Sequence, residues 1–435
     1  MMNFKRSILL VLLLVFIVLA YLKPSKQQVF YTSYFQQLNA ALQQSNKSAS
    51  CAIIDIDSLD NNIKAVQQQL GDKFHLRLVT KSLPSFALLD YLMLHTQSNK
   101  LMVFSEPFID AVLTKYDADS LDILLGKPLP IDAIKRLAAK HQKWNTFHYL
   151  VDTEKRLHEY IEFAKQQHTN IHLALEINVG LQRGGFDSPE KLAVAVKYIK
   201  ANQNIVQCSG LMGYDGHVPY VPFYINKENE IKKSFTKTQE TYNAFVKVLF
   251  QSYSKAEVSK MILNSGGSRT YFYYKNYTDT MSVNDIAIGS AFLAPSSFPE
   301  LTTHGHHAAL YLASPILKKI PSSQLPNAVA LSPFINWWNP NLKVSYFMIG
   351  GGWPGNIVAP NGIQKNSFWE KEGKGYTNLL PNQNILSSSI DNHLQVDDFV
   401  FSQAWEGDGM LCFSKVLLYK KKKIIGNWLT YTGAN

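Results

Sequence analysis

Cysteine is scarce in this sequence: 435 residues contain only three, Cys51, Cys208 and Cys412. An odd number of cysteines without a Cys-x-x-Cys pair excludes a disulfide framework and a cysteine-rich metal site. Each cysteine lies in an apolar stretch, where a free thiol behaves as a small hydrophobic side chain. We therefore expect all three to be buried free thiols.

Charged residues are also few, at 17% of the chain against 46% hydrophobic residues. This balance excludes a disordered chain, and 435 residues are too many for one ordinary core, so we expect two domains. The formal net charge of +10 can favour nucleic acid or an anionic membrane surface. The lysines are scattered, however, except for a run at 420–423 that we expect to form a β-turn. Nucleic acid is therefore not an expected partner.

A long hydrophobic run stands near the N-terminus. Lys5 and Arg6 precede an apolar segment at 8–22, as in the charged and apolar regions of a signal sequence. The run is short for a full span of roughly 20 residues, and small residues suited to cleavage are missing. We expect an uncleaved signal anchor, with a cleaved signal peptide as the alternative. The basic N-terminal flank favours an anchor in the inner membrane and an extracytoplasmic, periplasmic body, although lysines on the other flank weaken this orientation.

From residue 50 onward, short apolar runs alternate with amphipathic stretches. The runs lack strict alternation of apolar and polar residues, which is typical of strands buried on both faces. Helical segments are predicted between them, for example at 58–70, 154–167 and 188–202. Eight βα units over about 240 residues predict an α/β fold, the TIM (β/α)8 barrel, whose functional residues lie at the C-terminal ends of the strands. The eight runs are 51–56, 76–80, 101–104, 121–125, 147–151, 171–177, 206–212 and 261–264.

After about Pro295 the composition changes. Pro, Gly, Ser and Asn become frequent, and short β-type runs replace the helical periodicity, which predicts a separate β-domain. The expected organisation is a signal anchor at 1–25, a leader helix at 26–49, the barrel at 50–297 and the β-domain at 298–435.

Polar clusters follow several of the predicted strands. The segment Arg77-Leu-Val-Thr-Lys81-Ser82 ends the second one. A lysine at the inner end of a barrel strand is partly desolvated, which lowers its pKa and frees the amine to bond to a carbonyl. A plain surface lysine is the alternative.

Three further clusters fall at later strand ends. The segment 176–185 contains Arg183, and the segment 213–217 contains Tyr214 and His217. The segment 264–268 is a Gly-rich turn with hydroxyls, suited to wrapping backbone N–H groups around a phosphate, and Gly289-Ser290 offers a second such turn. Phosphate sites after the last strands recur in this barrel. A plain turn or a salt-bridged arginine would explain each part alone, but their joint occurrence favours one site.

In this order, the motifs resemble the fold-type III family of pyridoxal 5′-phosphate (PLP) enzymes, which includes alanine racemase, D-threonine aldolase and D-serine dehydratase. The sequence is most similar to the branch called amino-acid deaminase/aldolase, from about Ala52 to Gly433. The segment 77–82 resembles the PLP-lysine motif of the family, and 176–184 resembles its E-I-D-V-G-x-x-R-G segment, with Asn178 in place of Asp. The segment 213–217 resembles the G-Y-E-G-H motif, and 264–268 resembles the phosphate turn N-x-G-G-T.

The resemblance implies a role for each residue. Lys81 would form the Schiff base with PLP and later move protons at Cα, and Tyr214 and His217 are the other expected catalytic residues. PLP acts as an electron sink, and the protein supplies orientation and charge around its ring. The expected PLP-binding residues are Lys81, Arg183, Tyr214, Ser265, Gly266, Gly267, Ser268 and Ser290.

Two clusters raise the question of a metal. The metal pair of the related aldolases and dehydratases, His-x-Cys or His-x-Asp, aligns with Glu406 and Asp408. Two carboxylates suit Mg²⁺, Mn²⁺ or Ca²⁺ better than Zn²⁺, but a solvated turn and an acid/base role for Glu406 remain alternatives. The tract His304-Gly-His306-His307 has the composition of a metal site, yet we expect a solvated linker there.

The expected function is that of a PLP-dependent lyase acting on a small D-amino acid, of the D-threonine aldolase or D-serine dehydratase (deaminase) type. One alternative is an amino-acid racemase, for which the sequence offers no evident second base. The other is a membrane-tethered, PLP-binding pseudoenzyme, which the lost histidine and Asn178 keep open. The resemblance also implies a homodimer.

Overall fold

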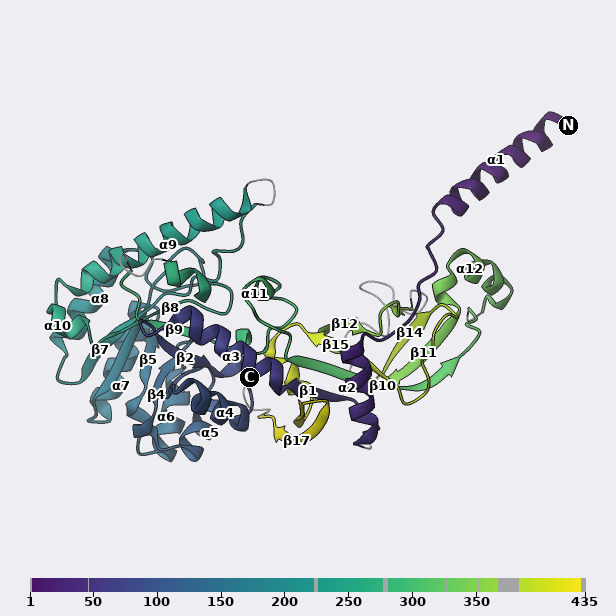
Figure 1. Cartoon of the computed structure of the whole chain (residues 1–435). Coiled ribbons are helices and arrows are strands. Elements are labelled where there is room, and N and C mark those ends of the chain that lie inside the picture. Colours follow the sequence, from purple (N-terminus) through teal and green to yellow (C-terminus); the bar gives the residue numbers. More distant parts are fainter. Residues whose placement is uncertain are drawn as a thin grey trace. The chain divides into compact units, whose positions relative to one another are not determined.

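The computed structural model (Figure 1) describes residues 2–45, 47–222, 226–276, 281–325, 327–350, 352–366 and 383–431. Gly433, where the family resemblance ends, lies outside these residues. The chain forms two compact units. The boundaries expected from the sequence, 50–297 and 298–435, make each domain one segment, whereas each unit combines three. The barrel unit comprises Ile56–Ala309, Glu406–Ser414 and Trp428–Asn435, and the β unit comprises Met1–Asp55, Leu310–Trp405 and Lys415–Asn427.

Eight parallel strands close into a ring in the barrel unit, so the predicted TIM barrel is confirmed (Figure 1). The last three residues of every strand are buried, as expected for strands covered on both faces. The strands are β2 (His75–Val79), β3 (Lys100–Val103), β4 (Asp122–Leu125), β5 (His148–Val151), β6 (Ile171–Glu176), β7 (Val206–Met212), β8 (Ile262–Ser265) and β9 (Asp285–Ile288).

Helices alternate with these strands and cover the outside of the ring. Side-chain caps begin several of them; the Thr153 hydroxyl, for example, accepts from the N–H of Arg156. The α-helices of this unit are α3 (Ile56–Leu70), α4 (Phe86–Thr96), α5 (Glu106–Lys115), α6 (Ile131–Lys140), α7 (Glu154–Gln166), α8 (Pro189–Ala201), α9 (Lys227–Leu249), α10 (Lys255–Val258) and α11 (Glu300–Thr303). The 3-10 helices are η1 (Thr80–Ser82), η2 (Ala118–Ser120), η3 (Trp144–Thr146), η4 (Tyr271–Asn276), η5 (Ser290–Phe292) and η8 (Gly407–Cys412).

A buried ion pair joins the first and last strands of the ring. Arg77 on β2 donates through Nε and Nη2 to the two carboxylate oxygens of Asp285 on β9, at 2.9 and 2.8 Å. Its Nη1 donates to Asp122 Oδ1 at 2.9 Å. Arg77 is fully buried, so the two carboxylates compensate a charge that would otherwise be costly inside the barrel.

The assignment of the first barrel strand was wrong. Residues 51–56 were expected to open the barrel, but β1 (Cys51–Asp55) belongs to the β unit, where it pairs with β10 and β16. The ring is closed instead by β9, which pairs with β2 and β8. Both segments are short, apolar and fully buried, so their residue pattern does not distinguish the two sheets. Lys81 consequently follows the first barrel strand and not the second.

The β unit contains a nine-stranded sheet in its described part. The β-domain predicted after about Pro295 is confirmed, because eight of these strands follow that residue. The lysine run at 420–423 forms the predicted turn, because Lys421 and Lys422, both with positive φ, connect β16 to β17. The strands are β1, β10 (Leu310–Ile320), β11 (Val344–Ile349), β12 (Gly355–Ala359), β13 (Gln364–Lys365), β14 (Gln383–Ser388), β15 (Phe399–Ala404), β16 (Lys415–Lys420) and β17 (Lys423–Leu429). The shorter helices are α12 (Ser332–Trp338), η6 (Val329–Leu331) and η7 (Pro340–Leu342).

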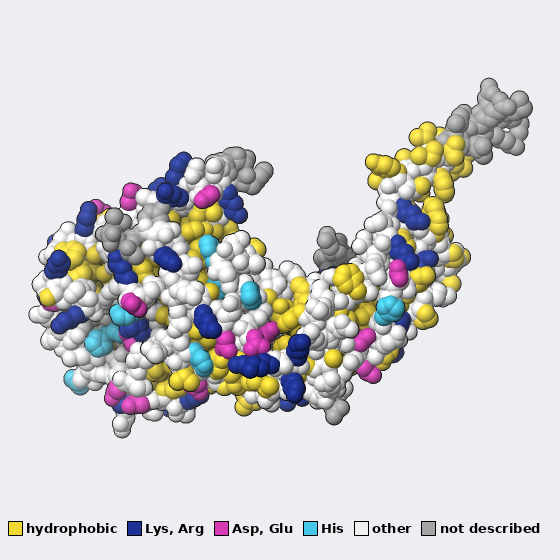
Figure 2. Space-filling model, viewed as in Figure 1, with side chains coloured by type: hydrophobic (Ala, Val, Ile, Leu, Met, Phe, Trp, Pro, Cys, Tyr) yellow, Lys and Arg dark blue, Asp and Glu magenta, His cyan; other side chains and the backbone are white. Residues whose placement is uncertain are grey.

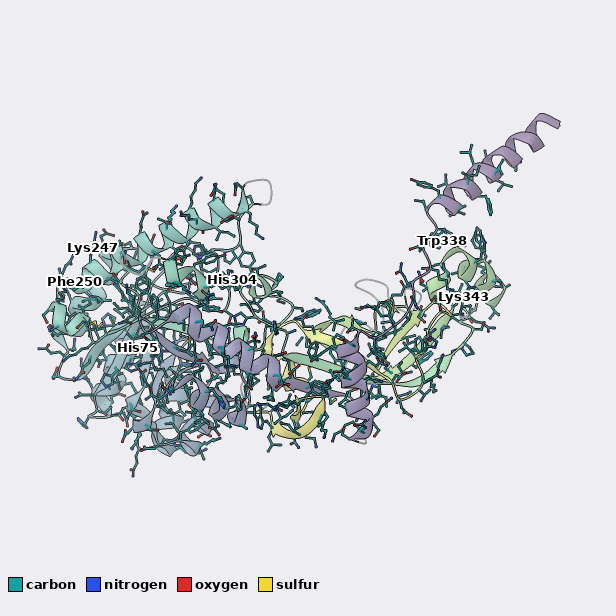
Figure 3. All side chains as sticks on the ribbon, viewed as in Figure 1. His75, Lys247, Phe250, His304, Trp338 and Lys343 are labelled. Atoms are coloured by element: carbon teal, nitrogen blue, oxygen red, sulfur yellow. The ribbon has the colours of Figure 1, made fainter. Side chains whose placement is uncertain are left out.

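The N-terminal segment forms two helices, α1 (Met2–Tyr21) and α2 (Ser33–Gln44). A single helix was expected across 26–49, whereas α2 covers only Ser33–Gln44 of that range. The end of α1 contacts α12, which carries the Trp338 labelled in Figure 3. The Trp338 indole N–H donates to the carbonyl of Leu19 at 3.0 Å. Among the described residues, no helix is both long and apolar enough to cross a membrane. The signal anchor stays a prediction from the sequence, as does the homodimer.

Figure 2 shows Lys and Arg side chains scattered over the visible face and interspersed with Asp and Glu.

The cysteines differ from expectation. Cys51 is buried and Cys208 is partly buried, but Cys412 is exposed. Cys412 ends the short helix η8, in which Gly407, Gly409 and Met410 face inward instead. The prediction of three buried thiols was therefore wrong for Cys412.

Candidate active site

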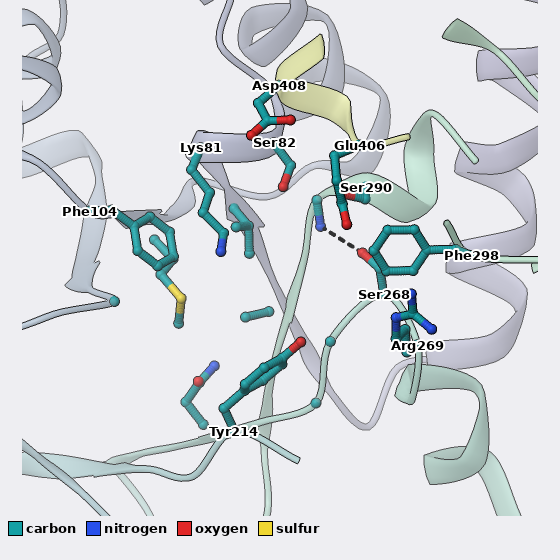
Figure 4. Close-up of a pocket in the computed structure, with 18 of the residues that line it drawn as sticks. Lys81, Ser82, Phe104, Tyr214, Ser268, Arg269, Ser290, Phe298, Glu406 and Asp408 are labelled. Carbon is teal, nitrogen blue, oxygen red and sulfur yellow. Dashed lines mark hydrogen bonds between the residues drawn. The ribbon is translucent and has the colours of Figure 1, made fainter. Parts of the chain in front are cut away.

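A cavity of about 440 Å³ opens at the C-terminal ends of the barrel strands. Its walls come from the residues that follow the strands, where a barrel of this kind carries its functional groups. All of its lining residues belong to the barrel unit. They include the residues labelled in Figure 4, which are Lys81, Ser82, Phe104, Tyr214, Ser268, Arg269, Ser290, Phe298, Glu406 and Asp408.

Lys81 points into this cavity from η1, directly after β2 (Figure 4). The preceding residue, Thr80, is buried and donates its hydroxyl hydrogen to the carbonyl of Met102 at 3.0 Å, which fixes η1 against β3. The Lys81 amine lies 5.0 Å from the centre of the Phe104 ring. Desolvation, followed by the charges of Arg183 and Lys127, lowers the pKa of Lys81. The predicted nucleophilic amine is therefore present at the barrel mouth.

The glycines of the predicted phosphate turn line the same cavity. Gly266 has a φ of +74°, which favours glycine, and an added Cβ would meet the Ile286 side chain at 2.9 Å. A Cβ on Gly267 would meet the Tyr214 ring at 2.7 Å. Within the described chain, the N–H groups of these two glycines donate to no backbone carbonyl. They are thus available to an anion such as a phosphate.

Ser268 ties this turn to the second predicted turn. Its hydroxyl oxygen accepts hydrogen bonds from the N–H of Gly289 at 3.4 Å and from the N–H of Ala291 at 2.9 Å. Its one hydroxyl hydrogen is left to donate to a ligand. The two turns, separate in sequence, therefore form one continuous wall of the cavity.

Arg183 and Tyr214 meet on another wall. The guanidinium carbon lies 4.9 Å from the centre of the Tyr214 ring, within the range of a cation–π contact. Arg183 Nη2 is also 3.4 Å from Glu176 Oε1. Desolvation raises the pKa of Tyr214 to about 12, so the phenol keeps its proton at neutral pH.

Glu406 and Asp408 line the cavity as well, although they lie far from the barrel strands in sequence. Ser290 donates its hydroxyl hydrogen to Glu406 Oε2 at 3.2 Å. Burial raises the pKa of both carboxyl groups. Among the described residues, no group of three or more His, Cys, Asp and Glu side chains is arranged to hold a metal ion, and the divalent cation expected here stays a prediction.

Two predicted site residues do not reach the cavity surface. Ser265 is buried beneath the turn, where its hydroxyl donates to the carbonyl of Gly213 at 2.6 Å. The Nε2 atom of His217 lies 3.2 Å from the Thr238 hydroxyl, and an added Cβ at Gly180 would meet it at 2.6 Å. The structure thus groups the other predicted residues around Lys81 and leaves these two behind the wall.

The histidine tract is not the solvated linker expected from the sequence. His306 is buried, and its Nε2 hydrogen-bonds with the Tyr271 hydroxyl. His304 stacks on Phe272 at a centroid distance of 3.6 Å, and only His307 is exposed. That prediction was wrong because Gly305, with a φ of +81°, turns the chain back onto the barrel.

Arg269 is a cavity residue that the sequence analysis missed. Its guanidinium carbon lies 4.3 Å from the Phe298 ring centre and 5.3 Å from that of Tyr220, and its Nη1 is 3.3 Å from Glu300. Its position directly after the Gly-rich turn was a usable signal, because a cation beside a phosphate cradle is chemically reasonable.

Comparison with known proteins agrees with this geometry. A family model described as alanine racemase, N-terminal domain, matches residues 54–291, which is more than half of the chain. The chain belongs to this family. The match contains every predicted cofactor-binding residue, whereas Glu406 and Asp408 lie beyond it. No curated protein matches the sequence significantly.

Solved structures of the alanine racemase fold resemble the chain over most of its length. D-threo-3-hydroxyaspartate dehydratase from Delftia sp. HT23 gives a TM-score of 0.65 at 11% identity, covering 88% of this chain and 99% of that one. D-threonine aldolase from Filomicrobium marinum gives a TM-score of 0.65 at 12% identity, covering 88% of this chain and 95% of that one. Alanine racemase from Clostridium difficile 630 gives a TM-score of 0.62 at 14% identity, covering 88% of this chain and 99% of that one. At these identities the likeness establishes the fold, and the resemblance predicted from the sequence motifs is confirmed.

Proposed function

We propose that this member of the alanine racemase N-terminal domain family is a PLP-dependent lyase that acts on a small D-amino acid. The observation that carries the proposal is the placement of the Lys81 amine and the Gly266-Gly267 turn on the walls of one cavity. An amine of lowered pKa and backbone N–H groups that donate to no carbonyl are two features that suit a phosphorylated aldehyde.

The residues present fit PLP. Gly266 and Gly267 lack a Cβ, which lets Ile286 and Tyr214 pack close against the turn. Their N–H groups, together with the Ser268 hydroxyl, would hold the phosphate. Lys81 would bond to the aldehyde carbon, and Arg183 and Tyr214 would contact the ring. Once bound, PLP supplies an electron sink for chemistry at the Cα of an amino acid.

The protein's own groups would then move protons and exclude water. Lys81, whose amine enters the cavity, would take a proton from the substrate Cα or return it. Glu406, oriented by Ser290, and Asp408 lie on the same cavity as Lys81 and are suited to contact the substrate side chain. The lyase proposal is supported by the shared fold with proteins named as a dehydratase and an aldolase over 88% of the chain.

An amino-acid racemase is the second candidate, because Tyr214, expected at this site from the sequence but not as a second base, lines the cavity. A racemase needs a second acid/base group facing the lysine across the ring. Figure 4 shows Lys81 and Tyr214 entering the cavity from different sides. The Tyr214 phenol is therefore the group available for that role.

The cofactor proposal is tested by titrating the purified full chain with PLP. We expect a visible absorption band characteristic of PLP bonded to a lysine, and borohydride reduction followed by peptide mass spectrometry should locate the adduct on Lys81. Lys81→Ala should abolish the band, whereas Lys191→Ala, which changes an exposed lysine paired with Asp187, should keep it. A wild-type chain that takes up no PLP would refute the proposal.

The reaction is tested by incubating the loaded protein with D-threonine, D-serine and D-alanine. Glycine with an aldehyde, or an oxo-acid with ammonia, would support the lyase. Production of the mirror-image amino acid alone would select the racemase, and absence of any turnover would favour the pseudoenzyme.

A further inference from the structure

A buried carboxylate lies directly behind the phosphate turn. Asp215 is fully buried and does not line the cavity. Its Oδ1 accepts from the Thr270 hydroxyl at 2.6 Å, and its Oδ2 accepts from the Tyr274 hydroxyl at 2.7 Å. Both donors belong to the segment that follows the Gly266-Gly267 turn, whereas Asp215 belongs to the loop after β7. The side chain therefore joins two loops that carry cavity residues.

These contacts fix the turn at both of its ends. Thr270 follows the turn, and its backbone N–H donates to the carbonyl of Gly267 at 3.0 Å. Ser265 precedes the turn, and its hydroxyl oxygen lies 2.8 Å from the Tyr274 hydroxyl. Asp215 thus holds Thr270 directly and also accepts the single hydroxyl hydrogen of Tyr274. Ser265 is held by its own bond to the carbonyl of Gly213 and lies against Tyr274. The four residues between Ser265 and Thr270 are therefore fixed at both ends, at one end by Asp215.

The rest of the network leaves little freedom in this arrangement. Gln239 donates its Nε2 hydrogen to the Tyr274 hydroxyl at 3.2 Å, and Ser265 donates to the carbonyl of Gly213 at 2.6 Å. Asp215 is adjacent to Tyr214, whose ring packs against Gly267. Hydrogen bonds to a buried carboxylate are among the stronger ones in proteins, and removing the acceptor leaves buried hydroxyls unsatisfied.

We propose that Asp215 is a positioning residue for the phosphate-binding turn, so that affinity for the phosphate of the cofactor depends on its carboxylate. This inference rests on the proposed PLP function. A phosphate is held only when several N–H groups converge on it, and the convergence of the Gly266 and Gly267 N–H groups requires both ends of the turn to be fixed. Bonding of the aldehyde to Lys81 does not depend on the turn, because η1 is anchored separately through Thr80.

The test compares PLP with pyridoxal, which has the same aldehyde but no phosphate. Full-length wild type, Asp215→Asn and Thr270→Val are titrated with each compound, following absorbance and reductive trapping on Lys81. We expect roughly 10- to 100-fold weaker PLP binding in both variants, as for loss of a hydrogen bond to a charged group. Pyridoxal binding should change by less than about twofold, since a group that interacts only with the phosphate adds nothing to it.

Conservative variants separate positioning from general stability. Thr270→Ser keeps the hydroxyl and should bind PLP as the wild type does. Thr241→Val removes a hydroxyl on α9 that bonds only within its helix, and it should leave both affinities unchanged. Where Asp215→Asn does not fold, Thr270→Val tests the same link.

Two results would overturn the proposal: equal loss of PLP and pyridoxal binding, or unchanged PLP binding in variants whose circular dichroism shows them folded. A wild-type chain that binds neither compound would instead refute the cofactor assignment itself. The two failures are therefore distinguishable.

Discussion

The Arg183 guanidinium lies over the ring of Tyr214, with 4.9 Å between its central carbon and the ring centre. The two residues follow different barrel strands, β6 and β7, and meet only because the ring brings strand ends together. Arg183 also acts on Lys81, because its positive charge disfavours the ammonium form and lowers the pKa of that lysine.

We predict that Arg183→Met raises the pKa of Lys81. Removal of a like charge stabilises the ammonium, so less free amine is present at a given pH. The pH midpoint for trapping pyridoxal on Lys81 should move upward in Arg183→Met and move less in Arg183→Lys, which keeps the charge. The measurement is trapped adduct against pH, and a midpoint that stays in place or falls would contradict the assigned interaction.

A second prediction concerns the packing of the phosphate turn. Gly267→Ala places a Cβ 2.7 Å from the Tyr214 ring, and the ring must move. Overpacking of this kind costs about 1–3 kcal/mol, so we expect roughly 10-fold weaker PLP binding. Gly426→Ala is the control, since an added Cβ there would lie 4.0 Å from its nearest neighbour, Leu418 Cδ1. Equal affinities for the two variants would show that the turn does not contact the cofactor.

The third prediction concerns the closure of the barrel. Arg77→Met leaves Asp285, which is 1% exposed, without its bidentate partner. Breaking a buried pair on one side costs about 3–5 kcal/mol, which urea unfolding measures directly. Arg136→Met removes a similar bidentate pair with Glu106 on the exposed surface and should change the free energy of unfolding little. A similar loss in both variants would argue against a special role for Arg77.

Thiol reactivity provides a fourth prediction. Cys412 is exposed, Cys208 is partly buried and Cys51 is buried. Burial raises the pKa of all three thiols, and the pKa reaches about 11 at Cys208 and about 12 at Cys51. The difference between them is therefore one of access, since only Cys412 is exposed. Brief alkylation of the native chain should therefore modify Cys412 first, as peptide mass spectrometry would report. Preferential labelling of Cys51 would mean that the β unit opens readily.

Much of the barrel and its site follows from local sequence. Lys81, Arg183, Tyr214, Gly266, Gly267 and Ser268 were expected at strand ends and Ser290 in a second turn, and the structure gathers them around one cavity. In a parallel barrel the residues that follow every strand lie at the same end of the ring. Predicting which residues reach the barrel mouth therefore requires only that the strands be recognised along the chain. The prediction holds even though the first strand was assigned to the wrong sheet.

The sequence did not predict which strands pair when they are far apart along the chain. Cys51–Asp55 and Asp285–Ile288 are both fully buried strands, and only contacts with distant strands decide which of them joins the ring. Whether a side chain enters the cavity is equally non-local. His217 follows a strand as Tyr214 does, yet it packs against Gly180 behind the wall. Glu406 and Asp408 were found through family resemblance, since nothing in their own neighbourhood indicates the barrel.

The return of η8 to the barrel has a consequence for biosynthesis. Gly407 packs so closely on Ser82 that an added Cβ would lie 2.1 Å from its carbonyl oxygen. Chains fold from the N-terminus as they leave the ribosome, so the barrel strands are synthesised long before the segment that supplies Glu406 and Asp408. A nascent chain that has already formed all eight barrel strands therefore still lacks one wall of the barrel mouth until the later segment with Glu406 and Asp408 has been made.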